Sequence, residues 1–234
     1  MTVDAPFYGA GLAKLEVHDL TGPLIVIEGA DGVGRSTHME LLQGWLEGHG
    51  LAVLSTGLVR SSLTRRGIMS AKEGHSFDRT TMALFYATDL GDRIQHEIIP
   101  GMRSGFVVLA DRYIYTTMAR GAARGLSRDW LAKLYGFALI PTRVFFLRLD
   151  PDELIRRTLR RGGELDYWES GRDVGLAPDL YSSFRAYQNL ILGYTFIIQY
   201  LGRRELVLQL EYPFLIQSLG IFSRVIFRVF AYIT

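Results

Sequence analysis

The residues best suited to chemistry stand together in one glycine-rich stretch near the start of the chain. The stretch consists of Gly29, Ala30, Asp31, Gly32, Val33, Gly34, Arg35, Ser36 and Thr37. An apolar run at residues 24–27 precedes it, and a helical pattern at residues 36–47 follows it. A strand, a glycine-rich turn and a helix form the arrangement in which backbone N–H groups and a helix N-terminus bind phosphate. The spacing therefore predicts a phosphate-binding loop, with a chance match in an ordinary glycine-rich turn as the alternative.

Three side chains of this stretch have predicted roles. The Ser36 hydroxyl is placed to bind Mg²⁺. Arg35 stands where such loops usually carry a lysine. Because arginine is also a cation but is larger and forked, we expect Arg35 to hold phosphate with an altered geometry. We expect Asp31 to accept a hydrogen bond from a substrate hydroxyl or from a nearby arginine, since a lone carboxylate beside phosphates is unfavourable.

A second polar group, Asp111, Arg112 and Tyr113, ends the apolar run at residues 106–111. Ligands of open α/β sheets bind at the carboxyl ends of the strands. We therefore predict that Asp111 holds hydrated Mg²⁺ through its water shell and that Arg112 clamps an acceptor phosphate with its fork. The alternative is a structural Asp–Arg pair at the end of a strand.

Composition excludes several classes of protein. The 234 residues are 48% hydrophobic, which is ample for a core, and their formal net charge of +2 does not indicate a nucleic-acid-binding protein. The sequence has no cysteine, so disulfides, cysteine-based zinc sites and a cysteine nucleophile are excluded. Residues 1–20 lack the apolar core of a secretory signal, and the uncharged part of residues 212–234 is too short to span a bilayer. We therefore expect a cytoplasmic protein with no transmembrane span.

The chain alternates strand-like runs with helical patterns. Strands are predicted at residues 24–28, 52–56, 106–111, 143–149 and 205–210, and helices at residues 36–47, 78–99, 127–139, 151–161 and 179–200. This alternation predicts an α/β fold with three layers, α/β/α, around a five-stranded, mostly parallel sheet. We divide the chain into an N-terminal extension (1–21), one domain (22–210) and an apolar C-terminal segment (211–234), whose role the pattern leaves open.

A glycine-rich stretch at residues 160–178 lies between two helical patterns and predicts a mobile surface loop. Four arginines lead into it: Arg156, Arg157, Arg160 and Arg161. On a helix they form i, i+4 pairs of like charge, which repel unless an anion lies near. We predict a small lid whose arginines, Arg157 and Arg161 among them, act on transferring phosphates. A solvated charged face is the alternative.

Together these motifs resemble those of the thymidylate kinases, which are nucleoside monophosphate kinases with a phosphate-binding loop. The resemblance covers residues 22–200. It rests on the glycine-rich loop at 27–37, Leu-Phe-Tyr-Ala at 84–87, Asp-Arg-Ile-Gln-His at 92–96, Ile-Pro at 99–100 and Asp-Arg-Tyr at 111–113. It implies transfer of the γ-phosphate of ATP to a nucleoside monophosphate, dTMP first, to give dTDP. It also implies Mg²⁺ dependence, a lid after the fourth strand and a homodimer.

The acceptor side departs from that family. Residues 56–62 replace its Arg-Glu-Pro-Gly-Gly stretch, with Arg60 as the available cation, and its Ala-Tyr-Gln reads Ala-Arg-Gly at 119–121. By direct count, the place of its acceptor-binding arginine holds Asp89, but Arg93, one helical turn further on, has the matching neighbours.

The predicted acceptor-binding residues are Arg60, Phe85, Tyr86, Arg93, Arg112 and Tyr113. Phe85 or Tyr86 is expected either to stack on the base or to pack in the core. Two other functions stay open, a kinase of the same fold with a different phosphorylated acceptor and a nucleotide-binding regulator with little turnover.

Overall fold

The structure is a computed structural model, and it describes residues 7–13, 15, 17, 19–160, 162–201 and 207–211. Its strands are β1 (Leu24–Gly29), β2 (Val53–Gly57), β3 (Val107–Asp111), β4 (Arg143–Arg148) and β5 (Val207–Glu211). They lie in the order β2-β3-β1-β4-β5, and each neighbouring pair is parallel. Every residue of the central strand β1 is buried, as expected of an apolar run with helices on both faces. The predicted α/β class with a parallel sheet is confirmed.

Nine helical segments are described, in chain order: α1 (Arg35–Gly48), α2 (Arg65–Gly74), α3 (Arg79–Arg93), a π-helical turn η1 (Ile94–Ile98), α4 (Ile99–Arg103), α5 (Ile114–Ala123), α6 (Arg128–Leu134), α7 (Pro151–Arg160) and α8 (Leu180–Leu201). The predicted helices at 36–47, 151–161 and 179–200 correspond to α1, α7 and α8. The predicted helix at 78–99 becomes α3 followed by η1 and the start of α4.

Helices α2 and α5 do not match any predicted helix, and α6 is shorter than the helix predicted at 127–139. Almost all residues of α5 are buried, so no amphipathic stripe marks it. In α2, only Ile68 and Ala71 are buried. The helix predicted at 127–139 stops at Leu134, because the next residues pair with the N-terminal segment. Gly9 N–H donates to the Gly136 carbonyl at 2.7 Å, and Tyr8 N–H donates to the Ala138 carbonyl at 3.0 Å.

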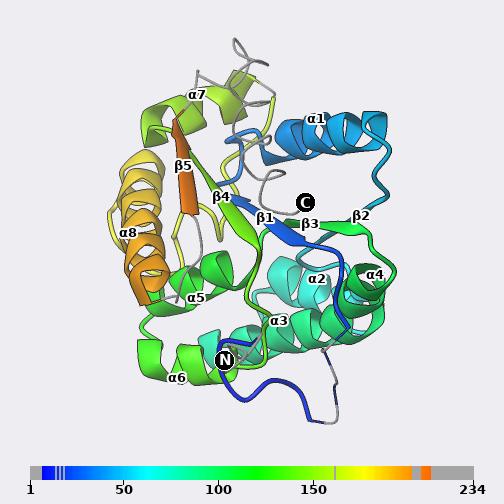
Figure 1. Ribbon diagram of the computed structural model, residues 1–234. Helices are drawn as coiled ribbons and strands as arrows, with labels where there is room; N and C mark the ends of the chain where they lie inside the picture. The colour runs from blue at the N-terminus through cyan, green and yellow to red at the C-terminus, as the bar shows by residue number, and fades with distance from the viewer. Residues whose placement is uncertain are drawn as a thin grey trace.

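The side chains of the sheet form one hydrophobic cluster on each face. On one face, Ile25, Ile27 and Leu109 pack with residues of α1 and α7. On the other face, Leu24, Val26 and Val108 pack with residues of α3, α4 and α5. Figure 1 shows α1 and α7 on the opposite side of the sheet from α2, α3 and α4, and α8 beside the edge formed by β4 and β5. The sheet is therefore the middle of three layers.

The strand register brings the two predicted motifs to one edge of the sheet. Ile27 lies opposite Asp111, and Asp111 also lies opposite Gly57 at the end of β2. On the other side of β1, Gly29 lies opposite Leu147. The glycine-rich loop and the Asp111–Tyr113 turn therefore leave the sheet side by side at its carboxyl edge. Over the residues that the structure describes, no helix is long and apolar enough to cross a membrane.

Candidate active site

The glycine-rich loop connects β1 to α1 and is shaped by its glycines. Gly34, the residue before α1, has φ +102°, and Gly29 has φ +146°. A Cβ on Gly29 would lie 2.7 Å from the Leu147 carbonyl oxygen of β4, so a larger residue does not fit there. No side chain caps the N-terminus of α1, and its first turn carries no acidic residue. Its first N–H groups are therefore suited to an anion.

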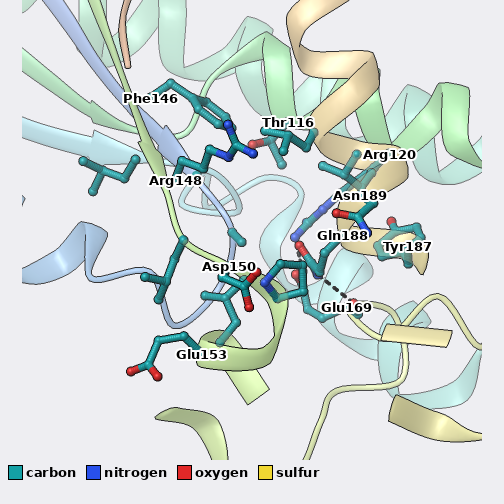
Figure 2. A pocket seen from close by; sticks show the side chains of 18 of the residues that line it. Thr116, Arg120, Phe146, Arg148, Asp150, Glu153, Glu169, Tyr187, Gln188 and Asn189 are labelled. Carbon is teal, nitrogen blue, oxygen red and sulfur yellow. Dashed lines mark hydrogen bonds and ion pairs between the residues drawn. The ribbon is translucent and has the colours of Figure 1, made fainter. Parts of the chain in front are cut away.

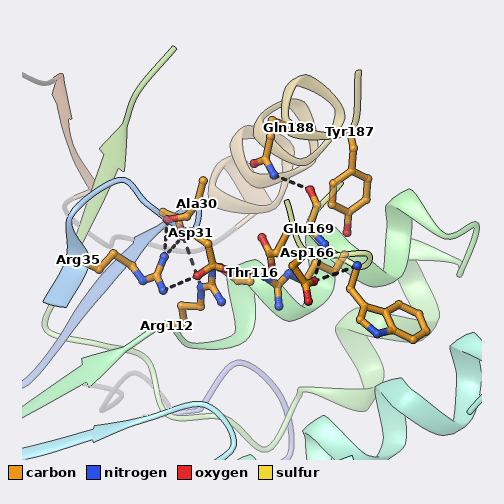
Figure 3. Close-up of polar contacts among 12 residues, drawn as sticks. Ala30, Asp31, Arg35, Arg112, Thr116, Asp166, Glu169, Tyr187 and Gln188 are labelled. Carbon is orange, nitrogen blue, oxygen red and sulfur yellow. Dashed lines mark hydrogen bonds and ion pairs between the residues drawn. The ribbon is translucent and has the colours of Figure 1, made fainter. Parts of the chain in front are cut away.

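The Arg35 guanidinium lies across the mouth of this loop, as Figure 3 shows. Its Nη1 donates to the carbonyl oxygens of Gly29 at 2.7 Å and Ala30 at 2.5 Å. Its Nε donates to Asp111 Oδ1 at 2.6 Å, and its Nη2 donates to Asp31 Oδ1 at 3.1 Å. Burial lowers the pKa of Arg35, but Asp31 and Asp111 outweigh it and raise that pKa. A lysine has no fork and cannot bridge all four acceptors in this way.

Asp31 lies among three arginines. Besides Arg35, it accepts a hydrogen bond from Arg112 Nη2 at 2.7 Å, and Arg120 Nη2 lies 3.6 Å from its second oxygen. Partial burial raises the pKa of Asp31, but the arginines, Arg112 first, hold it well below its usual range. This contact with arginine is one of the two alternatives predicted for Asp31.

Arg112 is held in an unusual backbone conformation. Its φ is +67°, and its N–H donates to the Ile27 carbonyl at 2.9 Å. This left-handed turn directly after β3 is unfavourable for a side chain with a Cβ, and it lets Arg112 reach back to Asp31. Burial and the neighbouring Arg35 and Arg120 lower the pKa of Arg112. The carboxylates of Asp31 and Glu169 partly offset this lowering.

Glu28, which was not among the predicted site residues, stabilises the turn that carries Arg112. It has no exposed surface and accepts hydrogen bonds from Tyr113 N–H at 2.8 Å and Thr116 N–H at 3.4 Å. It also accepts one from the Thr116 hydroxyl. Since α5 has no side-chain cap of its own, Glu28 satisfies the free N–H groups at its start and fixes the Asp111–Tyr113 turn above β1. A carboxylic residue inside an apolar strand was the signal available in the sequence.

Two cavities open beside the arginine cluster. The smaller one, about 460 Å³, is shown in Figure 2. It lies between the glycine-rich loop, β4 and α8, with Phe146 and Arg148 on its β4 side. The larger one, about 650 Å³, is lined by α2, α3, α5 and the segment after α7, with Phe77, Tyr86 and Trp168 among its aromatic residues. Arg120 lines both cavities.

Of the four predicted acceptor residues Tyr86, Arg112, Phe85 and Arg60, the first two line one of these cavities and the other two do not. Tyr86 lines the larger cavity, and Arg112 lines the smaller one. Phe85 packs against Phe77, with ring centroids 4.5 Å apart, rather than lining the cavity. Arg60 is exposed and makes only a long contact of 3.5 Å with the Ser55 carbonyl.

Two predicted acceptor contacts are corrected by the structure, because both side chains are fully buried. Tyr113 lies in the core and donates its hydroxyl to the Leu139 carbonyl at 3.1 Å. Arg93 Nε donates to Asp89 Oδ2 at 3.0 Å, and neither side chain of this pair is exposed. Asp89 in turn accepts from the N–H groups of Val59 at 3.0 Å and Ser61 at 3.1 Å. The pair therefore fastens the loop after β2 and has no surface for a nucleotide.

The remaining predicted residues lie on α1 and α7. Ser36 and Thr37 are exposed on the first turn of α1. Arg157 donates to Glu153 at 3.1 Å, one turn back on α7, and Arg161 lies outside the described residues. Among the residues with described positions, no three His, Asp or Glu side chains form a metal-binding group.

The comparisons with known proteins point in one direction. The model of the thymidylate kinase family matches residues 27–198. A probable thymidylate kinase 2 of Saccharolobus solfataricus is 35% identical over 173 residues, which cover 74% of this chain and 81% of that protein. A probable thymidylate kinase of Pyrococcus abyssi is 34% identical over 157 residues, covering 63% and 75%. A thymidylate kinase of Brachyspira hyodysenteriae is 27% identical over 175 residues, covering 70% and 82%.

Proposed function

Since the chain belongs to the thymidylate kinase family, we propose that it transfers the γ-phosphoryl group of ATP to dTMP and releases ADP and dTDP. One observation carries this proposal. A phosphate-binding loop and the arginine cluster Arg35, Arg112 and Arg120 lie at one sheet edge, beside a cavity large enough for a nucleotide. Phosphoryl transfer depends mainly on positioning two phosphates and neutralising their charge, and this site offers cations for both.

The donor phosphates are proposed to bind in the loop at residues 29–37. The N–H groups at the start of α1 face the phosphate oxygens, and Arg35 exchanges its contacts with the Gly29 and Ala30 carbonyls for the phosphates. In this way Arg35 acts in place of the usual lysine.

The oxygen atoms of Ser36 and Asp111 fit a Mg²⁺ ion. Ser36 is exposed beside the loop, and the Asp111 side chain is 21% exposed at the end of β3. Mg²⁺ prefers oxygen ligands and usually keeps several waters while it binds one or two carboxylates and the substrate phosphates. Bound there, it would neutralise charge on the transferring phosphate. Ser36 would hold it directly and Asp111 through water.

The acceptor is proposed to occupy the larger cavity, with its phosphate toward Arg112 and Arg120 and its base toward the aromatic lining. Tyr86 and Phe77, both on this lining, offer faces for the base. The segment at residues 162–178 is proposed to be the lid. Arg157 and Arg161 stay predicted contributors to the transfer, and Arg60 a predicted cation of the acceptor side. A homodimer is also proposed, and light scattering during size-exclusion chromatography tests it.

An assay of ADP release across a panel of nucleoside monophosphates tests the function. We expect release that depends on dTMP and on Mg²⁺. The control is Gly34→Val, because a β-branched residue does not readily adopt φ +102° and the loop should lose ATP binding. If ATP binds but no monophosphate supports release, the nucleotide-kinase function is wrong. Turnover with another phosphorylated compound would then indicate an altered acceptor, and no turnover at all would indicate a nucleotide-binding regulator.

A further inference from the structure

The segment after α7 is docked on the body of the protein rather than free. Trp168 Nε1 donates to the Lys72 carbonyl of α2 at 3.1 Å. From α8, the Ser183 hydroxyl donates to the Ser170 carbonyl at 2.9 Å, and Gln188 Nε2 donates to the Glu169 carbonyl at 2.9 Å. Ser170 has no exposed surface. One short segment is therefore held by helices that lie on two sides of it.

The same segment approaches α8 too closely for any residue but glycine at one point. Gly171 has φ +64°, and a Cβ there would lie 2.6 Å from the Cβ and ring of Tyr187. Such packing requires one fixed position of the segment against α8. In that position, Tyr167, Trp168, Asp173 and Val174 line the larger cavity.

Arg124, the residue that follows α5, lies between the segment and α8. Its Nε and Nη2 donate to the two oxygens of Asp173 at 2.6 and 3.1 Å, and Nη2 also donates to the Trp168 carbonyl at 3.1 Å. Its Nη1 donates to the Tyr187 hydroxyl at 2.5 Å and to the Arg120 carbonyl at 3.3 Å. The guanidinium carbon lies 5.6 Å from the Trp168 ring centroid and 5.2 Å from that of Tyr187.

These contacts use the whole hydrogen-bonding capacity of the side chain. A guanidinium has five N–H donors, and the five contacts above go to protein acceptors. Arg124 therefore has no donor left for a substrate, although it lines the larger cavity. The guanidinium fork matches the Asp173 carboxylate, which a lysine could contact through only a single nitrogen.

We propose that Arg124 is a positioning residue that holds residues 166–173 in place as one wall of the acceptor cavity. The proposal rests on the proposed function in one respect, namely that the larger cavity takes dTMP. The wall supplies Trp168 to the cavity and holds Glu169 against Arg120. Loss of Arg124 therefore acts first on the acceptor side, because none of its five hydrogen bonds goes to the glycine-rich loop.

The test compares the parent chain with Arg124→Lys, which keeps the charge and removes the fork. Hydrogen exchange of the amides at residues 165–175 should become about tenfold faster or more, because the wall opens more often. The KM for dTMP should rise about tenfold or more, while kcat and the KM for ATP stay within about threefold. Arg172→Lys is the matched control, because it makes the same replacement at an exposed position of the same segment. It should change neither readout.

A second variant, Asp173→Asn, weakens two of the five contacts and should shift both readouts in the same direction. Unchanged exchange in both variants overturns the proposal. Faster exchange with an unchanged KM for dTMP also overturns it, because the segment is then not a wall of the acceptor cavity. If the parent chain shows no turnover with dTMP, the proposed function fails, and the exchange result alone decides whether Arg124 positions the segment.

Discussion

Replacing Arg35 with alanine removes the side chain that makes the most contacts in the proposed donor site. The guanidinium donates to Gly29, Ala30, Asp111 and Asp31, and only 11% of the side chain is exposed. The variant leaves two carboxylates without one of their cations and removes the positive charge from the mouth of the loop. Both ATP binding and the transition state should suffer, because charge that develops on the phosphate is no longer met by a fixed cation.

The expected magnitude follows from these contacts. Loss of one preorganised charged contact costs about 2–4 kcal/mol of transition-state stabilisation, which is about 30- to 1,000-fold in kcat/KM. The free energy of unfolding should fall less, by about 1–3 kcal/mol, because Asp31 keeps Arg112 as a partner. For a domain of this size, each kcal/mol lowers Tm by about 2–4 °C. The catalytic loss should therefore exceed the stability loss.

Arg35→Lys keeps the positive charge and removes the forked guanidinium, so it tests the two properties separately. A lysine keeps a cation near the phosphates but cannot bridge Asp31 and Asp111 together with the two carbonyls. We expect activity within about tenfold of the parent or above it. Because Asp111 then loses its 2.6 Å contact with the guanidinium, less Mg²⁺ should be needed for half-maximal activity. Titration of ATP binding at several Mg²⁺ concentrations gives the same comparison without turnover.

The assay is steady-state ADP release for the three proteins, with urea unfolding of each as the control for stability. If Arg35→Ala is as active as the parent, Arg35 is not the phosphate cation, and that charge must come from elsewhere. If both variants lose activity in proportion to stability, Arg35 has a structural role alone. Either result would refute the role assigned to its guanidinium.

Three further outcomes test the rest of the site. Arg112→Lys should raise the KM for dTMP about tenfold or more and leave ATP affinity within about twofold, because only the forked contact is lost; an unchanged KM would remove Arg112 from the acceptor side. Burial raises the pKa of Glu28 above its ordinary value of 4.5, so the folded state binds that proton more tightly than the unfolded chain does. The free energy of unfolding should therefore fall as the pH rises above 4.5. In Glu28→Gln this fall should be smaller, as measured by urea unfolding at a series of pH values. An equal fall in the parent and the variant would contradict the burial argument. Asp89→Asn should lower the free energy of unfolding by about 3–5 kcal/mol, since it breaks the buried pair with Arg93 and weakens the loop after β2. Chemical denaturation checks this, and a loss below about 1 kcal/mol, typical of an exposed pair, would contradict it.

The glycine-rich loop and the turn after β3 could be predicted from the sequence because their determinants are local. An apolar run gives β1, glycines give the backbone conformations of the loop, and the amphipathic pattern after it gives α1. The place of Asp111 followed from one further rule, since parallel strands end at a common edge. The strand register confirms that Asp111 lies beside the end of β1, because it pairs with Ile27. None of these steps requires knowledge of a side chain distant in sequence.

The surroundings of the proposed acceptor site could not be predicted in the same way. Arg93 looked like a ligand because of its neighbours in sequence, but its direction is set by Asp89 one helical turn before it and by the loop after β2. Arg124 and Glu28 act through partners 49 and 85 positions away. α5 is buried nearly all round, which removes the periodic signal that marks a surface helix. These features depend on which segments the fold brings together, and one sequence contains no direct sign of that.

The charges of the site balance before any phosphate binds. Three arginines face three carboxylates: Arg35, Arg112 and Arg120 against Asp31, Asp111 and Glu169. A phosphate that binds here therefore replaces a carboxylate as the partner of an arginine, because no arginine of the cluster is without a carboxylate. Asp31 accepts hydrogen bonds from both Arg35 and Arg112, which we assign to the donor and the acceptor phosphate. A phosphate that binds one of these arginines would leave Asp31 paired with the other. This sharing gives a physical reason for a carboxylate inside a loop that we propose binds an anion.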